Sequence, residues 1–81
     1  MAAKSVNTTV AEIYDSGGSS KMVLVQNCGT GGLWVDVIYG PNGTVSNTTG
    51  VYVAVNALVP FDVYQGRLLA VSNGTSDVRW C

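Results

Sequence analysis

The sequence predicts an all-β fold, a single small antiparallel β-sandwich or barrel of about seven short strands with no helix. Apolar and polar residues alternate with a period of two, and no window shows the i, i+3, i+4 apolar spacing of an amphipathic helix. Clusters rich in Gly, Asn, Ser and Thr separate the alternating runs, at intervals of about ten residues. We assign residues 6–81 to one sandwich domain and expect residues 1–5 to form a flexible N-terminal arm.

Each expected strand is a short run bounded by turn-forming residues. The first, VNTTVAEIY at 6–14, is β-branched and aromatic and is followed by a Gly/Ser turn. The later runs are too short for helices or alternate clearly, and they lie at 21–27, 33–39, 51–55, 58–64, 67–72 and 77–81. Pro60 lies inside one of these runs, so that strand is expected at a sheet edge or with a bulge, because proline donates no ladder hydrogen bond.

The glycine-rich segment NCGTGG, residues 27–32, invites comparison with a phosphate-binding loop. Such a loop works because it leads into the N-terminus of a helix, whose free N–H groups face the anion. Here the alternating run LWVDVIY follows, and no Lys-Ser/Thr pair comes after the glycines. We therefore interpret the segment as a hairpin-type turn in which the glycines supply positive φ.

The strand at 33–39 has two different faces. Leu33, Val35 and Val37 are expected to point into the core, which places Trp34 and Ile38 on the opposite, outward face. An exposed Trp–Ile pair on a face with little charge is a liability for a free monomer, and it indicates a surface covered by a partner.

The chain carries little charge. Charged residues make up 11% of it, against roughly 25% in typical soluble domains. The four basic residues are scattered, which argues against nucleic-acid binding. No apolar run approaches the ~20 residues of a membrane span. With no apolar signal-peptide region near the start, we expect synthesis in a cytoplasm. Small size and low charge together predict a homo-oligomer, a dimer or a trimer.

The residue types also argue against an enzyme. There is no histidine, which removes the commonest general base and metal ligand. Two cysteines cannot complete a structural zinc site of about four ligands. The carboxylates adjoin turns or lie on polar strand faces, and they are Glu12, Asp15, Asp36, Asp62 and Asp77. We expect no catalytic, cofactor-binding or metal-binding residues, and no cofactor.

The sequence leaves open whether Cys28 and Cys81 form a disulfide. A Cys28–Cys81 disulfide would close most of the chain and contribute roughly 4 kcal/mol by the chain-entropy model. Cytoplasmic synthesis argues against such a bridge, although oxidation after cell lysis would still allow it.

The order of the segments resembles a family of small phage virion proteins. The resemblance rests on NTTVAEI, MVLVQNCGTGGLWV, TTGVYV and FDVYQGRLLAVSNGTSDVRW, and covers about Asn7 to Trp80. Its elements are a Thr-rich strand, an apolar strand ending in Gln-Asn, a glycine turn, an aromatic strand, a strand that starts with Gly, a Tyr-x-Gly corner and a final Val-Arg strand. The chain departs from this pattern at Cys28 and Cys81.

The resemblance implies a β-sandwich or barrel component of a phage head, neck or tail, assembled as an oligomer. Within this class we expect a capsid decoration (cement) protein that binds the major capsid protein or another virion protein and is located in the virion. The alternatives are a neck, tail or fibre component, or a carbohydrate-binding module for host attachment. The residues expected to contact the partner are Trp34, Ile38, Met1, Ala2, Ala3, Lys4 and Ser5.

Overall fold

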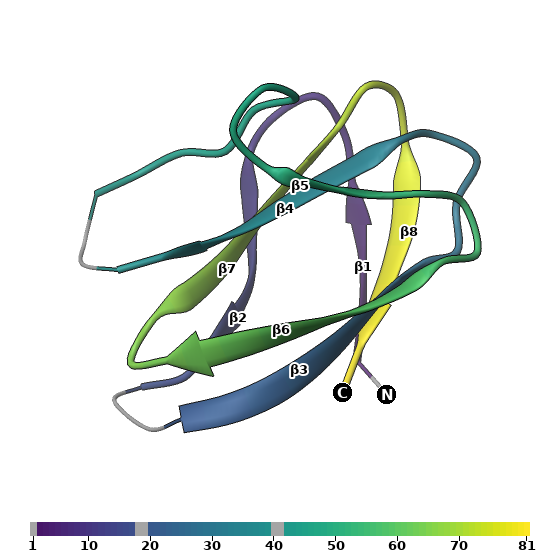
Figure 1. Ribbon diagram of the computed structural model, residues 1–81. Coiled ribbons are helices and arrows are strands. Elements are labelled where there is room, and N and C mark those ends of the chain that lie inside the picture. Colours follow the sequence, from purple (N-terminus) through teal and green to yellow (C-terminus); the bar gives the residue numbers. More distant parts are fainter. Residues whose placement is uncertain (1, 18–19, 40–41) are drawn as a thin grey trace.

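The computed structural model describes residues 2–17, 20–39 and 42–81, and these residues form strands and no helix. The predicted all-β sandwich is therefore confirmed. One four-stranded sheet, sheet A, has the order β1-β8-β3-β6, and the other, sheet B, has the order β2-β7-β4-β5 (Figure 1). The strands are β1 (Ala2–Val6), β2 (Ala11–Asp15), β3 (Ser20–Asn27), β4 (Leu33–Ile38), β5 (Val51–Val53), β6 (Leu58–Tyr64), β7 (Arg67–Ser72) and β8 (Ser76–Trp80).

The antiparallel pairs are nested. β1 pairs with β8, β2 with β7, β3 with β6 and β4 with β5. The chain is thus arranged as one long hairpin, with its tip between β4 and β5, rolled up so that its arms form both sheets. This order is that of the eight-stranded double-sheet jelly roll. It also brings the two chain ends side by side (Figure 1).

The start of the chain differs from the prediction. The run at 6–14 is not one strand, because Asn7 Oδ1 accepts a hydrogen bond from the Thr9 amide at 2.8 Å and turns the chain from sheet A to sheet B. Residue 1 lies outside the described residues, and Ala2–Val6 pair with β8 over their whole length. The expected flexible arm is therefore an edge strand over its described part.

The core lies between the two sheets and consists mainly of inward-facing aliphatic side chains. The predicted inward positions Leu33 and Val35 are fully buried, and Val37 packs against them at the margin. The other buried members of this cluster are Val6, Ile13, Val23, Val25, Val53, Phe61, Val63, Leu68, Ala70 and Val78. Among the described residues there is no helix of the length and hydropathy that a membrane crossing requires.

Pro60 lies in an edge strand, as predicted, because β6 is the outermost strand of sheet A. Pro60 stands opposite Leu24, whose N–H and C=O both bond to Cys81 on the other side of β3. Leu24 and Pro60 therefore form a non-hydrogen-bonded pair, and the nitrogen of Pro60 faces the open edge. The proline removes the middle donor of an otherwise unpaired strand edge.

The segment 27–32 is a connection between strands, as predicted, but it is not a hairpin, because β3 and β4 belong to different sheets. Among the described residues the glycines with positive φ are Gly17 and Gly43, so those of this connection do not supply it. Gly29 is required by close approach instead. A Cβ there would lie 2.5 Å from the backbone of Ser76 and Asp77.

The buried amide of Asn27 organises the same connection. Its Nδ2 donates to the carbonyls of Gly31 at 2.9 Å and Val53 at 3.0 Å. Its Oδ1 accepts from the Gly29 amide at 3.1 Å and from the Ser76 hydroxyl. Because the side chain is fully buried and all its polar capacity is used, Asn27 ties β3, β5 and β8 together at one corner of the sandwich.

Candidate functional site

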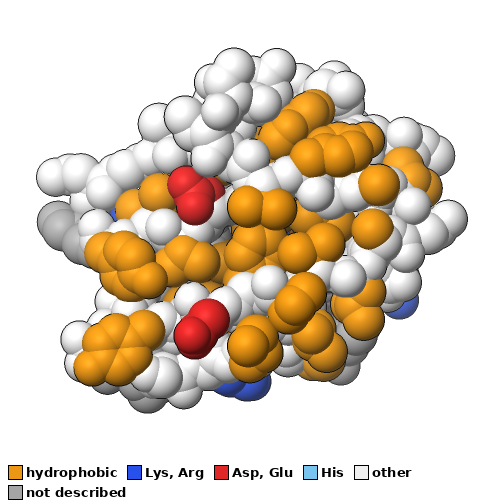
Figure 2. All heavy atoms as spheres, in the orientation of Figure 1, with side chains coloured by type: hydrophobic (Ala, Val, Ile, Leu, Met, Phe, Trp, Pro, Cys, Tyr) orange, Lys and Arg blue, Asp and Glu red, His pale blue; other side chains and the backbone are white. Residues whose placement is uncertain are grey.

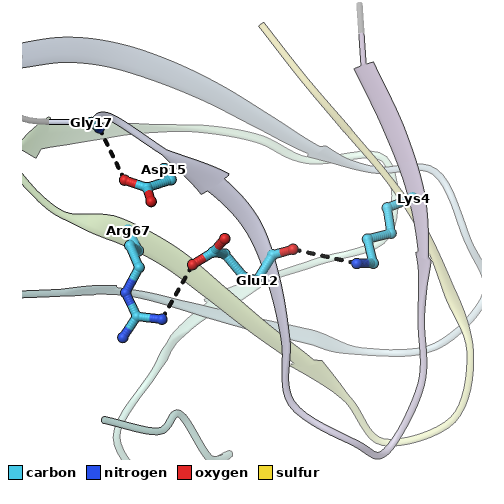
Figure 3. Close-up of polar contacts among 5 residues, drawn as sticks. All are labelled: Lys4, Glu12, Asp15, Gly17 and Arg67. Atoms are coloured by element: carbon cyan, nitrogen blue, oxygen red, sulfur yellow. Dashed lines mark hydrogen bonds and ion pairs between the residues drawn. The ribbon is translucent and has the colours of Figure 1, made fainter. Parts of the chain in front are cut away.

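The charged side chains near β1, β2 and β7 are engaged in contacts within the chain (Figure 3). Arg67 Nη1 donates to Glu12 Oε1 at 3.2 Å, and Lys4 Nζ reaches the Glu12 carbonyl at 3.5 Å, which links the edge strands of the two sheets. Asp15 Oδ1 accepts from the Gly17 amide at 2.9 Å, the turn bond expected from its sequence position. Partly exposed ion pairs of this kind contribute little to stability, and here they lie at a solvent-exposed edge of the sandwich.

The remaining carboxylates also lie on the surface of the fold. Asp36 accepts from the Val37 amide at 2.9 Å, and Asp77 pairs with Arg79 at 3.2 Å. Asp62 is exposed on the outer face of sheet A. Within residues 2–17, 20–39 and 42–81, no three Asp, Glu or Cys side chains gather into a group able to hold a metal ion.

The strand register separates the two cysteines. Cys81 bonds to Leu24, and the Cys28 amide bonds to the Asp77 carbonyl, so the two thiols lie at opposite ends of the β3–β8 contact. Leu24 and Cys28 are roughly 13 Å apart at ~3.3 Å per residue, whereas a disulfide needs Cα atoms within about 7 Å. Both cysteines are free thiols and exposed, so the bridge left open by the sequence is absent from this fold.

Trp34 and Ile38 lie on the outer face of sheet B, as the alternation predicts, but they are half-buried and not exposed. The β4–β5 connection folds back over them, and its Val45 is only 2% exposed. A Cβ on Gly50 would lie 2.9 Å from the Trp34 Cβ, and one on Gly43 would meet Ile38 directly. This cover was not predictable from the sequence, because the connection is polar and has the composition of an ordinary surface loop.

A cleft of about 280 Å³ opens beside Trp34. The β1–β2, β4–β5 and β7–β8 connections meet there at one end of the sandwich, at the top of Figure 1. Among the described residues its lining carries no charged side chain, and it consists of Thr8, Val10, Trp34, Val45, Ser46, Asn47, Val71, Ser72 and Asn73. The cleft was not predictable from the sequence, because its polar residues come from connections that lie far apart in the chain.

A second surface is the outer face of sheet A. Five apolar side chains of β3 and β6 form most of it, with the carboxylate of Asp62 opposite Met22 among them, and we call it the apolar sheet face: Met22, Leu24, Leu58, Pro60 and Tyr64. Its most exposed members are Met22, Leu58 and Tyr64, at 56%, 52% and 58%. Figure 2 shows hydrophobic side chains spread across the side of the molecule where β6 lies, with few charged groups among them.

Comparisons with protein-family models, with curated proteins and with solved structures find no match for this chain. The site is therefore interpreted from its own geometry. That geometry offers two separate surfaces, the uncharged cleft at the loop end of the sandwich and the apolar sheet face.

Proposed function

We propose that this chain is a non-enzymatic virion structural protein, a decoration (cement) protein that binds the outside of a phage head as a homo-oligomer. Three features support the proposal: the resemblance to small virion proteins, the scarcity of charge, and a jelly-roll strand order, which viral capsid domains also use. The last support is analogy at the level of the fold, and the same order occurs in lectin domains. Because the strand order does not distinguish these functions, the main evidence for the proposal is the distribution of apolar side chains on the surface.

The observation that carries it is the apolar sheet face. In a free monomer, Met22, Leu58 and Tyr64 expose about half of their surface or more. Contact with another subunit would remove this area from water, which contributes about 25 cal/mol per Å² of apolar surface. Pro60 blocks the middle of the neighbouring strand edge, so association occurs by packing of faces and not by continuous strand pairing. This surface replaces Trp34 and Ile38 as the proposed contact.

The role of this face is tested with Leu58→Lys. A lysine at this position, at the end of the face opposite Gln26, should abolish self-association and binding to particles without changing the fold, because position 58 is 52% exposed. Tyr52→Lys is the matched control, since Tyr52 is 54% exposed on the outer face of the other sheet. Sedimentation and co-purification with particles measure the two effects. Equal behaviour of the two variants, or a monomer both in solution and on particles, contradicts the proposal.

The cement role itself is tested by heating particles. A protein that binds the assembled shell and not its free subunits stabilises the shell by mass action, about 2.7 kcal/mol per site at 100 times the Kd. Particles that lack the protein should release DNA at a lower temperature. Identical release temperatures argue against cementing. Selective loss of host attachment would favour the neck, tail or fibre alternative.

A further inference from the structure

We propose that the cleft beside Trp34 is a binding site for a neutral saccharide. The inference goes beyond the virion role and does not depend on it, because the cleft lies on the loop end and outer face of sheet B, whereas the apolar sheet face belongs to sheet A.

The cleft has an apolar floor and polar walls. Trp34 and Val71 stand opposite each other on β4 and β7 and form the floor. The walls carry the hydroxyl of Thr8 and the amides of Asn47 and Asn73, one from each of the three loops. A few polar groups around an apolar base are the usual composition of a small-molecule site, and the volume is near the lower end of the ~300–1,000 Å³ range of such sites.

The walls are fixed by hydrogen bonds inside the protein. Ser72 Oγ donates to the Gly32 carbonyl at 2.6 Å, and the Gly32 amide donates to Asn73 Oδ1 at 2.9 Å. The Ser72 amide donates to the Asn7 carbonyl at 2.9 Å, which ties the β1–β2 connection to β7. The β4–β5 wall closes on itself, since the Gly50 amide donates to the Ser46 carbonyl at 2.9 Å. Such a preformed cleft loses little conformational entropy when a ligand binds.

Room for the indole is also built into the backbone. A Cβ on Gly32 would come within 3.1 Å of the Trp34 ring and 3.2 Å of the Tyr52 ring, so the absence of a side chain there lets both rings pack together. The Trp34 and Tyr52 centroids are 5.2 Å apart at a tilt of 48°, which holds the indole from one side. The indole is thereby held in place where it lines the cleft.

The chemistry of the lining selects the ligand class. A charged ligand would lose hydration without gaining an ion pair, because none of the lining side chains is ionisable at neutral pH. Amides and hydroxyls both donate and accept, which matches the hydroxyl groups of a sugar. Asn73 uses its Oδ1 on Gly32, so its Nδ2 can donate to a ligand. The C–H face of a pyranose would pack on the indole.

The test is a nuclear magnetic resonance titration of the intact chain with glucose, galactose, mannose, N-acetylglucosamine, maltose and lactose. At least one of them should shift the Trp34 indole N–H and the amides of Gly32, Asn47 and Asn73. Asn47→Ala should weaken that binding about tenfold through the lost hydrogen bonds. This variant should fold normally, because Asn47 is an exposed loop residue. Trp34→Ala should abolish binding.

Tyr64→Ala is the control, since Tyr64 is an exposed aromatic residue on the other sheet and should leave saccharide binding unchanged. The proposal is overturned if no sugar in the panel shifts a cleft signal at about 10 mM, ten times a 1 mM Kd. It is also overturned if Asn47→Ala binds as tightly as the unmodified chain, or if sulfate or glucuronate shifts the cleft signals more than the neutral sugars. These outcomes do not bear on the Leu58→Lys experiment, so the two proposals fail separately.

Discussion

Gly29 shows how a single residue decides whether the β3–β4 connection can lie against strand β8. Its backbone passes so close to Ser76 and Asp77 that an added Cβ would lie 2.5 Å from backbone atoms, which cannot move aside as a flexible side chain can. Gly29→Ala should therefore lower the free energy of unfolding by about 1–3 kcal/mol, the usual cost of overpacking.

Gly74→Ala is the matched control, because nothing lies within 4 Å of a Cβ at that position. Its effect should stay within about 0.5 kcal/mol, or be slightly stabilising through a less flexible unfolded chain. Urea unfolding of both variants measures the difference. Equal unfolding midpoints would show that the close approach at Gly29 relaxes easily.

The connection between β3 and β4 was predictable from its residue types only in part. The cluster of glycines after Asn27 predicted a connection, and the alternation of LWVDVIY correctly excluded a helix N-terminus. The buried role of Asn27 was not predictable, because its four partners come from Gly29, Gly31, Val53 and Ser76. An asparagine in a turn and an asparagine that joins strands look alike until the tertiary partners are known.

β6 is the element whose exposure defines the proposed contact. Its inner residues Phe61 and Val63 are buried, and its outer residues form part of the apolar sheet face. One of its edges has no partner strand in the part of the chain that the structure describes. Pro60→Val would restore the missing N–H at this open edge. The variant should keep its fold and aggregate more readily, because the edge would then present an unbroken set of donors and acceptors.

Light scattering during incubation at 37 °C measures this effect. Pro60→Lys is the control, since it restores the same N–H while adding a charge that discourages edge pairing. If Pro60→Val remains as soluble as the unmodified chain, the proline is not protecting the edge.

Strands were predictable from the sequence to different degrees. β6 and β7 match their predicted bounds, because clear alternation or an apolar run ends at turn residues on both sides. β1 was missed, because residues 1–5 were expected to form a flexible arm. The predicted strand 6–14 joined only its last residue, Val6, to β2, since the Asn7 turn lies in a stretch of β-branched residues. The cover over Trp34 could not be foreseen either, because it depends on the path of the connection through Val45.

At the scale of the whole molecule, the nested pairing separates the two proposed surfaces. Rolling up one long hairpin places the β1–β2 and β7–β8 connections at one end. The β4–β5 connection leaves β4 at the other end, where Ile38 pairs with Arg67, and folds back over sheet B to complete the cleft. The same operation leaves β6 at the rim of sheet A with its outer face in solvent. A subunit attached through the apolar sheet face would therefore keep the cleft accessible, so a single small domain can assemble and bind a ligand at once.

The pairing of the chain ends gives the last prediction. A flexible arm could be removed without affecting the fold, but β1 pairs with β8 from Ala2↔Trp80 to Val6↔Ser76, and Val6 is 1% exposed. Deleting residues 1–6 removes a buried aliphatic side chain and leaves β8 with an open edge. Loss of the Val6 side chain alone should cost about 2–4 kcal/mol, a large part of the roughly 5–15 kcal/mol that stabilises a typical domain. The truncated chain should therefore unfold at markedly lower urea concentration.

Tryptophan fluorescence follows this transition, because Trp80 pairs directly with β1. Ala3→Ser serves as the control, since it changes an exposed β1 side chain while keeping every backbone partner, and its midpoint should stay close to that of the unmodified chain. A truncated chain with an unchanged midpoint and slope would mean that β1 adds nothing to the folded state. It would then be an arm available to a neighbouring subunit. A lower midpoint assigns it to the sandwich, because the strand that closes sheet A cannot be detached without exposing the core beneath it.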